Sequence, residues 1–177
     1  MLLTAYPSIT RDEFQQACQA FESRCQDGRR LDGTDWLSVT WTGEEVRIKQ
    51  RRKEQWSDEE EQIINFSIAY SSTYSVPVLW FWSLRLSTAA HVHAIVAEHL
   101  DQAVRSVGVM GAISQAYHPV TDMPAFFIHP CNTHSAMRAV DDGERLSQED
   151  YLLIWLGLTG SSIGLHVPSH LLTHSVG

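Results

Sequence analysis

Apolar positions recur at helical spacing near the start and near the end of this chain. The first helix is predicted to begin at a capping box, in which Thr10 caps the helix and Glu13 bonds back to it. A second capping pattern, Ser147 with Asp150, predicts a helix through Leu158 that is apolar nearly all round and therefore buried. The apolar positions of the first helix are three and four residues apart and should form one buried face: Phe14, Ala17, Cys18, Phe21 and Cys25.

Strand patterns occupy much of the middle of the chain. Residues 36–42 are rich in Trp, Val and Thr, and residues 64–70 alternate with a period of two. Residues 78–86 alternate as well, and the short link before them makes these two runs an antiparallel hairpin. Two shorter strands, 113–117 and 125–129, should flank a segment of turn-forming residues.

Two further segments complete the expected fold. Residues 44–62 are mostly charged, so we expect a solvated loop, with a short exposed strand allowed at Val46 and Ile48. Residues 92–104 have helical periodicity, with Thr88 as the expected cap. The whole pattern predicts an α+β fold, an α/β two-layer arrangement in which a mainly antiparallel sheet is flanked by helices.

Composition limits the classes of function. A chain of 177 residues with 44% hydrophobic residues can bury one core, so we expect a single domain over residues 1–177. The formal net charge of -8 argues against a nucleic-acid partner, because such proteins present a basic face. No apolar run approaches the ~20 residues of a membrane span, so we expect a cytoplasmic protein without one. Three cysteines without disulfide or zinc spacing fit a reducing compartment.

One of the three thiols has a distinctive position. Cys131 follows a strand-like apolar run and Pro130, so it should sit where regular backbone stops and side chains face a cleft. A thiol with a reference pKa of about 8.5 is only slightly ionised at neutral pH. That suffices to exchange one thioester for another, because this exchange needs access and orientation more than strong activation. Cys131 is therefore the candidate nucleophile.

The residues around Cys131 resemble a known signature. His129, Pro130 and Cys131 form a His-Pro-Cys tripeptide, and residues 124–133 resemble the active-site signature of the autophagy E2-like conjugating enzymes. Residues 70–81 read Tyr-Ser-x-x-Tyr-x-Val-Pro-Val-Leu-x-Phe, and this segment is also similar to that family. Trp155-Leu156-x-x-x-Gly160, followed by Val167-Pro168, is similar to the C-terminal segment of the family.

The resemblance implies an E2-like (UBC-like) fold and a modifier transferase without a cofactor. In that family a ubiquitin-like modifier is received from an E1-like activating enzyme and carried as a thioester, here on Cys131. Two kinds are known, one that conjugates a modifier to a lipid and one that conjugates a modifier to a protein. Thr133 and the short 44–62 connection favour the protein-conjugating kind, with the lipid-conjugating kind as the alternative. The protein-conjugating kind transfers autophagy modifier twelve to a lysine of a target protein, autophagy protein five.

Transfer to an amine also requires donors for the tetrahedral oxyanion. Asn132 and Thr133 are the nearest neutral donors in sequence, and Tyr74 is a further candidate if the hairpin places it at the cleft. Ordinary turn capping is the alternative role for Asn132. His129 is expected to hold the backbone through an imidazole hydrogen bond, and a role as a base is its alternative.

Three other interpretations use the same residues. A Cys-His hydrolase would pair Cys131 with His134 or His118, although no third, orienting residue is evident. A non-catalytic E2-like interaction module would leave Cys131 inert. We expect no metal, because nine histidines make chance clustering common. The zinc site that would contradict this expectation has as its ligands His129, Cys131, His134 and either His118 or the pair His91 and His93.

A target protein is expected to dock partly by adding a strand to an exposed sheet edge. The sequence places that edge near residues 44–53, where charged residues alternate with apolar ones. Arg47, Arg51 and Arg52 would then belong to the docking surface, and reversing their charge should impair conjugation.

Overall fold

The computed structural model describes residues 2–26, 31–53, 61–84, 113–140 and 146–172. Their elements, in chain order, are α1 (Arg11–Gln26), β1 (Trp36–Trp41), β2 (Glu45–Lys53), β3 (Glu61–Ser71), β4 (Val76–Trp82), β5 (Ile113–Tyr117), β6 (Pro124–Ile128), the 3-10 turn η2 (Pro130–Asn132), α4 (Thr133–Val140), α5 (Gln148–Gly160), and the 3-10 turns η3 (Ser161–Ile163) and η4 (Ser169–Leu171).

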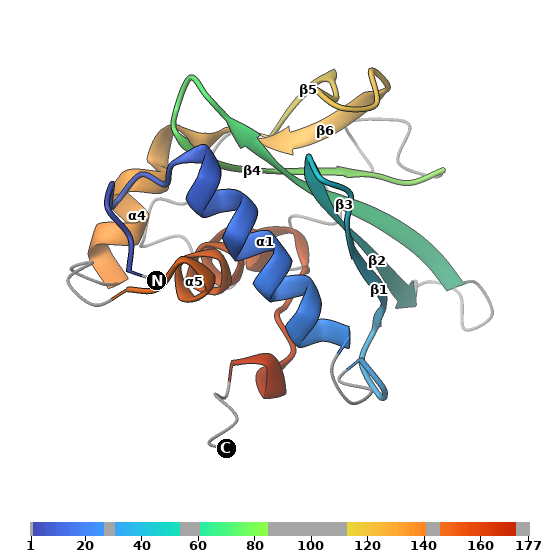
Figure 1. Cartoon of the computed structure of the whole chain (residues 1–177). Coiled ribbons are helices and arrows are strands. Elements are labelled where there is room, and N and C mark those ends of the chain that lie inside the picture. The colour runs from blue at the N-terminus through green and yellow to red at the C-terminus, as the bar shows by residue number, and fades with distance from the viewer. Residues whose placement is uncertain (1, 27–30, 54–60, 85–112, 141–145, 173–177) are drawn as a thin grey trace.

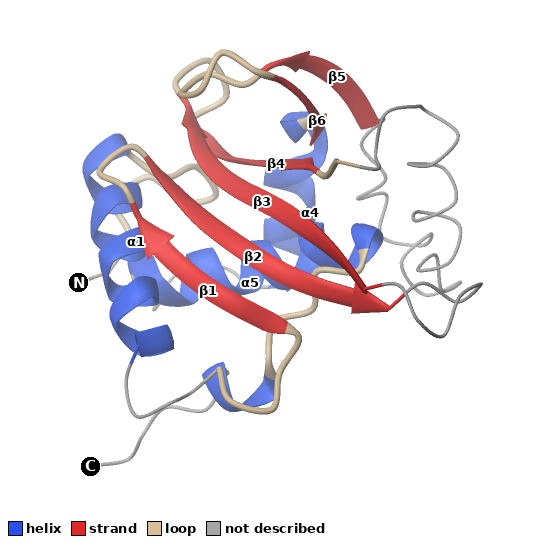
Figure 2. Ribbon diagram, turned by 90° about the vertical axis from the view of Figure 1, so that its right-hand side faces the viewer, coloured by secondary structure: helices blue, strands red, loops and turns tan. Residues whose placement is uncertain are grey.

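The strands form one six-stranded sheet with the order β1-β2-β3-β4-β6-β5. Every neighbouring pair is antiparallel. Helices α1 and α5 cross one face of this sheet, and α4 lies beside α5 (Figure 1, Figure 2). The predicted α+β fold, with an antiparallel sheet flanked by helices, is confirmed for the described residues.

The two predicted helix starts are present. Thr10 Oγ accepts the backbone N–H of Glu13 at 3.2 Å, while the Glu13 carboxylate accepts the backbone N–H of Thr10 at 2.8 Å. Ser147 Oγ accepts the backbone N–H of Asp150 at 3.1 Å, so α5 is capped as its sequence predicted. The apolar face of α1 and most of α5 are buried against the sheet in one core, whose largest members include Phe14, Phe21, Phe66, Phe81, Tyr151 and Trp155.

The charged segment 44–62 contains the main error of the sequence prediction. Residues 45–53 form the nine-residue strand β2, and β3 already begins at Glu61. Val46 and Ile48 point into the core, while Arg47 and Lys49 alternate with them and stay exposed. Charged residues on the solvent face do not oppose a strand whose other face is buried.

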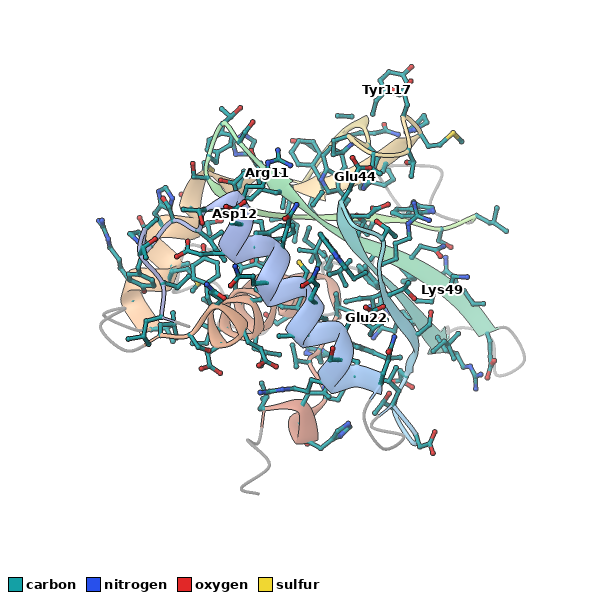
Figure 3. The ribbon with its side chains drawn as sticks, viewed as in Figure 1. Arg11, Asp12, Glu22, Glu44, Lys49 and Tyr117 are labelled. Atoms are coloured by element: carbon teal, nitrogen blue, oxygen red, sulfur yellow. The ribbon has the colours of Figure 1, made fainter. Side chains whose placement is uncertain are left out.

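The position of β2 also contradicts the predicted docking edge at residues 44–53. Strand β2 pairs with β1 along one side and with β3 along the other, so its backbone groups are used within the sheet. Among the described strands, β1 and β5 are the outermost. The β1 side is partly covered by α1, because the Glu22 carboxylate accepts the backbone N–H of Trp41 at 2.9 Å (Figure 3).

Other boundaries differ less. The hairpin of β3 and β4 is antiparallel as predicted, but β4 ends at Trp82, and Leu84 is fully exposed rather than part of the strand face. The two short strands were predicted within one residue of β5 and β6. Helix α4 was not predicted. The helix expected over residues 92–104 lies outside the described residues.

Candidate active site

Cys131 lies where strand β6 gives way to a helical turn. Strand β6 ends at Ile128, and His129 has extended backbone with φ -64° and ψ 128°. Pro130 follows as the first residue of η2, a position that suits proline because its fixed φ matches the turn and no N–H is needed there. The predicted break in regular strand structure before Cys131 is therefore present.

Cys131 differs from the other two cysteines in exposure. Its side chain is exposed, whereas Cys18 and Cys25 are buried in the core on α1. Burial raises the pKa of the Cys18 thiol far above its ordinary value, because the thiolate would lose its hydration. Of the three thiols, Cys131 is the one that another protein can reach.

His129 joins the Cys131 turn to the β3–β4 hairpin. Its Nδ1 accepts the backbone N–H of Cys131 at 3.2 Å, so the predicted hydrogen bond from His129 to the backbone is present. Its Nε2 lies 3.3 Å from Tyr74 Oη. The two rings meet edge to face, with centroids 5.4 Å apart and an interplanar angle of 78°. Both ring nitrogens are thus occupied, which leaves His129 poorly suited to act as a base for the thiol.

Tyr74 reaches the site from the turn between β3 and β4. The turn is tight, and Ser75 adopts a positive φ of 53° there. Tyr74 remains 37% exposed, and its hydroxyl lies beside the His129 ring. The sequence predicted Tyr74 only on the condition that the hairpin faces the cysteine, and the structure brings the two segments together.

Asn132 and Thr133 lie directly after Cys131, at the join between η2 and α4. The backbone N–H of Thr133 donates to the carbonyl of Pro130, which closes the turn. Asn132 is exposed, and Thr133 is half-buried. Both residues border a small pocket of about 10 Å³, room for about one water molecule. Its lining residues are Pro77, Ile128, His129, Asn132, Thr133, Ala136, Met137, Trp155, Leu158 and Thr159.

The histidines proposed for a hydrolase lie elsewhere. His134, on α4, has its Nε2 3.1 Å from Ser8 Oγ, in the segment before α1. His118 is buried in the turn between β5 and β6. Neither forms a hydrogen bond with the Cys131 thiol within the described part of the chain. The described residues also contain no group of three His, Cys, Asp or Glu side chains placed to hold a metal ion. His91 and His93 lie outside the described residues.

His118 instead belongs to a buried polar cluster that sequence reasoning missed. Its Nε2 lies 2.9 Å from Ser67 Oγ and 3.3 Å from a carboxylate oxygen of Glu45. Ser67 Oγ donates a short hydrogen bond to the same carboxylate. The backbone N–H groups of Val120 and Thr121 donate to His118 Nδ1 at 3.2 and 3.3 Å. We call Glu45, Ser67 and His118 the buried triad; it fastens the β5–β6 turn to strands β2 and β3.

The electrostatics of the buried triad favour a neutral imidazole. Burial lowers the pKa of His118, while the Glu45 carboxylate acts to raise it and Arg47 to lower it. The pKa of His118 therefore lies below its ordinary value. Arg47 already compensates the Glu45 charge, since its Nη2 and Nε lie 2.6 and 2.8 Å from Glu45 Oε1. No sequence signal marked this cluster, because Glu45 and Ser67 occupy positions that alternate with core residues and would normally face solvent.

The fold and the exposed cysteine after β6 together define an E2-like protein. The sequence profile of the family described as "Autophagocytosis associated protein, active-site domain" matches residues 13–170. This match covers most of the chain, and the chain belongs to that family.

Several curated relatives are similar to the chain. It is 32% identical over 144 residues to the ubiquitin-like-conjugating enzyme ATG10 of Gibberella zeae, covering 77% of this chain and 57% of the relative. For the ATG10 proteins of Dictyostelium discoideum and Homo sapiens, the identities are 29% and 28%, covering 64% and 58% of this chain and 55% and 49% of the relatives. The chain therefore spans about half the length of these relatives. In the described ranges, no helix is both long and apolar enough to cross a membrane.

Proposed function

We propose that this protein is an E2-like conjugating enzyme that carries a ubiquitin-like modifier as a thioester on Cys131. The exposure of Cys131, in contrast to the burial of Cys18 and Cys25, is the observation that carries the proposal. Membership in a family of autophagy-associated active-site domains, and relatives named ubiquitin-like-conjugating enzymes, support it.

In the first step Cys131 receives the modifier from an E1-like activating enzyme. The Cys131 thiolate attacks the carbonyl carbon of the modifier thioester, and the thiolate of the activating enzyme leaves with the electron pair of the broken carbon–sulfur bond. One thioester replaces another of similar energy, so the reaction needs little more than access and alignment. The exposed turn at η2 provides that access.

In the second step an amine of the target displaces Cys131. The lysine nitrogen attacks the thioester carbonyl, and a tetrahedral intermediate with a negatively charged oxygen forms and loses a proton from nitrogen. Its collapse expels the Cys131 thiolate and leaves an isopeptide bond. Hydrogen-bond donors near the cysteine stabilise the oxyanion. Tyr74, Asn132 and Thr133 are the donors that we propose, with Tyr74 favoured by its contact with His129.

We further propose that the modifier is autophagy modifier twelve and that the target is autophagy protein five, in the cytoplasm. Thr133 and the absence of a long insertion in the sequence between residues 44 and 62 support this protein-conjugating assignment, as the sequence resemblance implied. Transfer of the modifier to an aminophospholipid instead of a protein lysine would assign the chain to the lipid-conjugating kind.

A serine at position 131 tests the thioester directly. Cys131→Ser protein incubated with modifier, activating enzyme and ATP should form a stable adduct, because an ester resists the thiols that cleave a thioester. The adduct should disappear in mild alkali. Cys18→Ser and Cys25→Ser, checked for correct folding, should load like the unmodified protein. Loading that persists as a thioester in Cys131→Ser would place the acceptor on another cysteine and contradict the proposal.

A further inference from the structure

The hydrogen bonds around His129 have a defined direction. The Cys131 N–H can only donate, so Nδ1 of His129 must present its lone pair to it. A neutral imidazole with a free lone pair on Nδ1 carries its hydrogen on Nε2. That hydrogen points to Tyr74 Oη, 3.3 Å away, so Tyr74 accepts from His129. One ring therefore connects the backbone of the cysteine turn to the hydroxyl of Tyr74.

This direction fixes what the Tyr74 hydroxyl can still do. Because one lone pair of Oη accepts the His129 hydrogen, the hydroxyl's own proton must be donated to something else. Within the described residues no acceptor for that proton is found, and Tyr74 is 37% exposed. A hydroxyl that accepts one hydrogen bond also becomes a stronger donor, since the two bonds polarise one another. The Tyr74 O–H is therefore a donor that has no acceptor among the described residues, and His129 holds it near the Cys131 turn.

We propose that His129 is a positioning residue, whose ring orients the Tyr74 hydroxyl so that its proton points to the oxyanion formed on the Cys131 thioester. The inference rests on the proposed function and adds the residue that makes Tyr74 a donor. Hydrogen-bond partners that orient metal-ligating side chains commonly change affinity or activity by about 10–100-fold when lost, and we expect a residue that orients the Tyr74 hydroxyl to act on the same scale. His129 also caps the turn that presents Cys131, so one side chain aligns both the sulfur carrier and the donor.

His129→Asn tests the two hydrogen bonds of the His129 ring separately, because it should keep one and remove the other. The amide oxygen of asparagine lies where Nδ1 lies and is among the favoured N-cap acceptors, so the turn keeps its cap. The shorter side chain cannot reach Tyr74. Tyr74→Phe removes the donor itself and leaves the ring of the tyrosine in place. Tyr117→Phe is the matched control, because Tyr117 is 70% exposed and projects from the far end of the β5–β6 hairpin (Figure 3).

The measurement is single-turnover discharge of preloaded protein to free lysine, normalised to the fraction loaded. His129→Asn is expected to discharge about tenfold more slowly, with the loss falling on discharge more than on loading. Tyr74→Phe should be at least as slow, and the double variant no slower than Tyr74→Phe alone, because His129 acts through Tyr74. Tyr117→Phe should discharge at the normal rate.

Two results would overturn the inference while leaving the carrier role of Cys131 intact. One is discharge of His129→Asn at the unmodified rate. The other is a double variant whose losses multiply, which would mean that His129 acts independently of Tyr74. If the unmodified protein fails to load Cys131 at all, the proposed function falls instead. The hydrogen-bond chain is then tested by nitrogen NMR of the His129 ring, where a hydrogen on Nδ1 rather than Nε2 would refute it.

Discussion

Cys18 and Cys131 carry the same thiol, and their surroundings decide what each can do. Cys18 is fully buried on α1, where desolvation raises its pKa and side chains block approach. Cys131 is exposed on η2, two residues after His129, whose ring contacts Tyr74 of a separate hairpin. Cysteine reactivity depends on the accessible thiolate, so the residue type alone does not identify the nucleophile.

This contrast predicts the outcome of alkylation. In the folded protein, a small alkylating reagent should modify Cys131 and spare Cys18 and Cys25, because both of these thiols are buried and the pKa of Cys18 is raised as well. After unfolding in denaturant all three should react. Intact-mass analysis with peptide mapping gives the measurement. Rapid modification of Cys18 under native conditions would contradict the packing of α1 described above.

The same contrast applies to carboxylates on α1. Glu13 is buried and accepts hydrogen bonds from the backbone and hydroxyl of Thr4 at 2.7 and 2.9 Å, and from those of Thr10 at 2.8 and 2.8 Å. Burial by itself raises the pKa of Glu13, but these bonds stabilise the charged form and the net pKa lies below its ordinary value. Asp12, next to it, is exposed (Figure 3).

At the scale of elements, Glu13 ties the segment before α1 to the helix itself. Thr4 lies well before the helix, so the Glu13 carboxylate extends the ordinary capping box by a second pair of donors. That segment also contacts the side of the molecule that carries the candidate active site, since Ser8 meets His134 on α4 and the backbone N–H of Ile9 donates to the carbonyl of Ser75 at 2.9 Å. The start of α1 thus supports the hairpin turn that carries Tyr74.

Glu13→Gln should therefore lower the free energy of unfolding by about 2 kcal/mol at pH 7. Because the pKa of Glu13 is depressed in the folded state, its contribution is present above the unfolded pKa and is lost as pH falls through the folded pKa. The variant should accordingly lose less stability than the unmodified protein on acidification below about pH 4.5. Urea unfolding at several pH values measures both effects. Asp12→Asn, an exposed neighbour, is the control and should change the free energy little; equal losses in both variants would refute the prediction.

At the scale of the whole molecule, the buried triad joins three parts of the sheet. Glu45 comes from β2, Ser67 from β3 and His118 from the turn after β5, so the cluster forms only when the sheet is complete. The His118 ring also packs edge to face against Trp80 and Trp82, with centroids 5.2 and 5.7 Å away. The β5–β6 hairpin, which leads directly into the Cys131 turn, is fixed to the sheet by these contacts.

The triad predicts a pH dependence of global stability. Since burial depresses the pKa of His118, the unfolded chain takes up a proton near pH 6.5 that the folded chain does not yet bind. The contribution of His118 to the free energy of unfolding is fully present above that pH, and it is lost as pH falls toward the lower pKa of the folded state. His118→Asn should be less stable at neutral pH but should show a shallower decline as pH falls below about 6.5. Chemical unfolding at several pH values measures the free energy of unfolding of both proteins. If the two free energies fall in parallel with pH, His118 does not titrate in this way.

The sequence by itself determined the local elements and the candidate nucleophile. Capping boxes at Thr10 and Ser147, the alternation in β3 and the turn chemistry around Cys131 are signals carried by residues within a few positions of one another. Such signals depend on backbone geometry and the burial of one face, so they can be recognised before any tertiary contact is known. The family resemblance rested on contiguous motifs of the same kind.

Tertiary structure alone decided which segments meet. The charged residues of β2 made it look like a loop in the sequence, although a strand needs only one buried face. Its position between β1 and β3 is set by pairing across the sheet. The burial of Glu45 and Ser67 depends on a turn that follows them by about fifty residues or more in the chain. The contact of Tyr74 with His129 likewise joins two segments far apart in sequence. Long-range contacts leave no periodic trace in the sequence, since their energy depends on the folded arrangement and not on the spacing of residues along the chain.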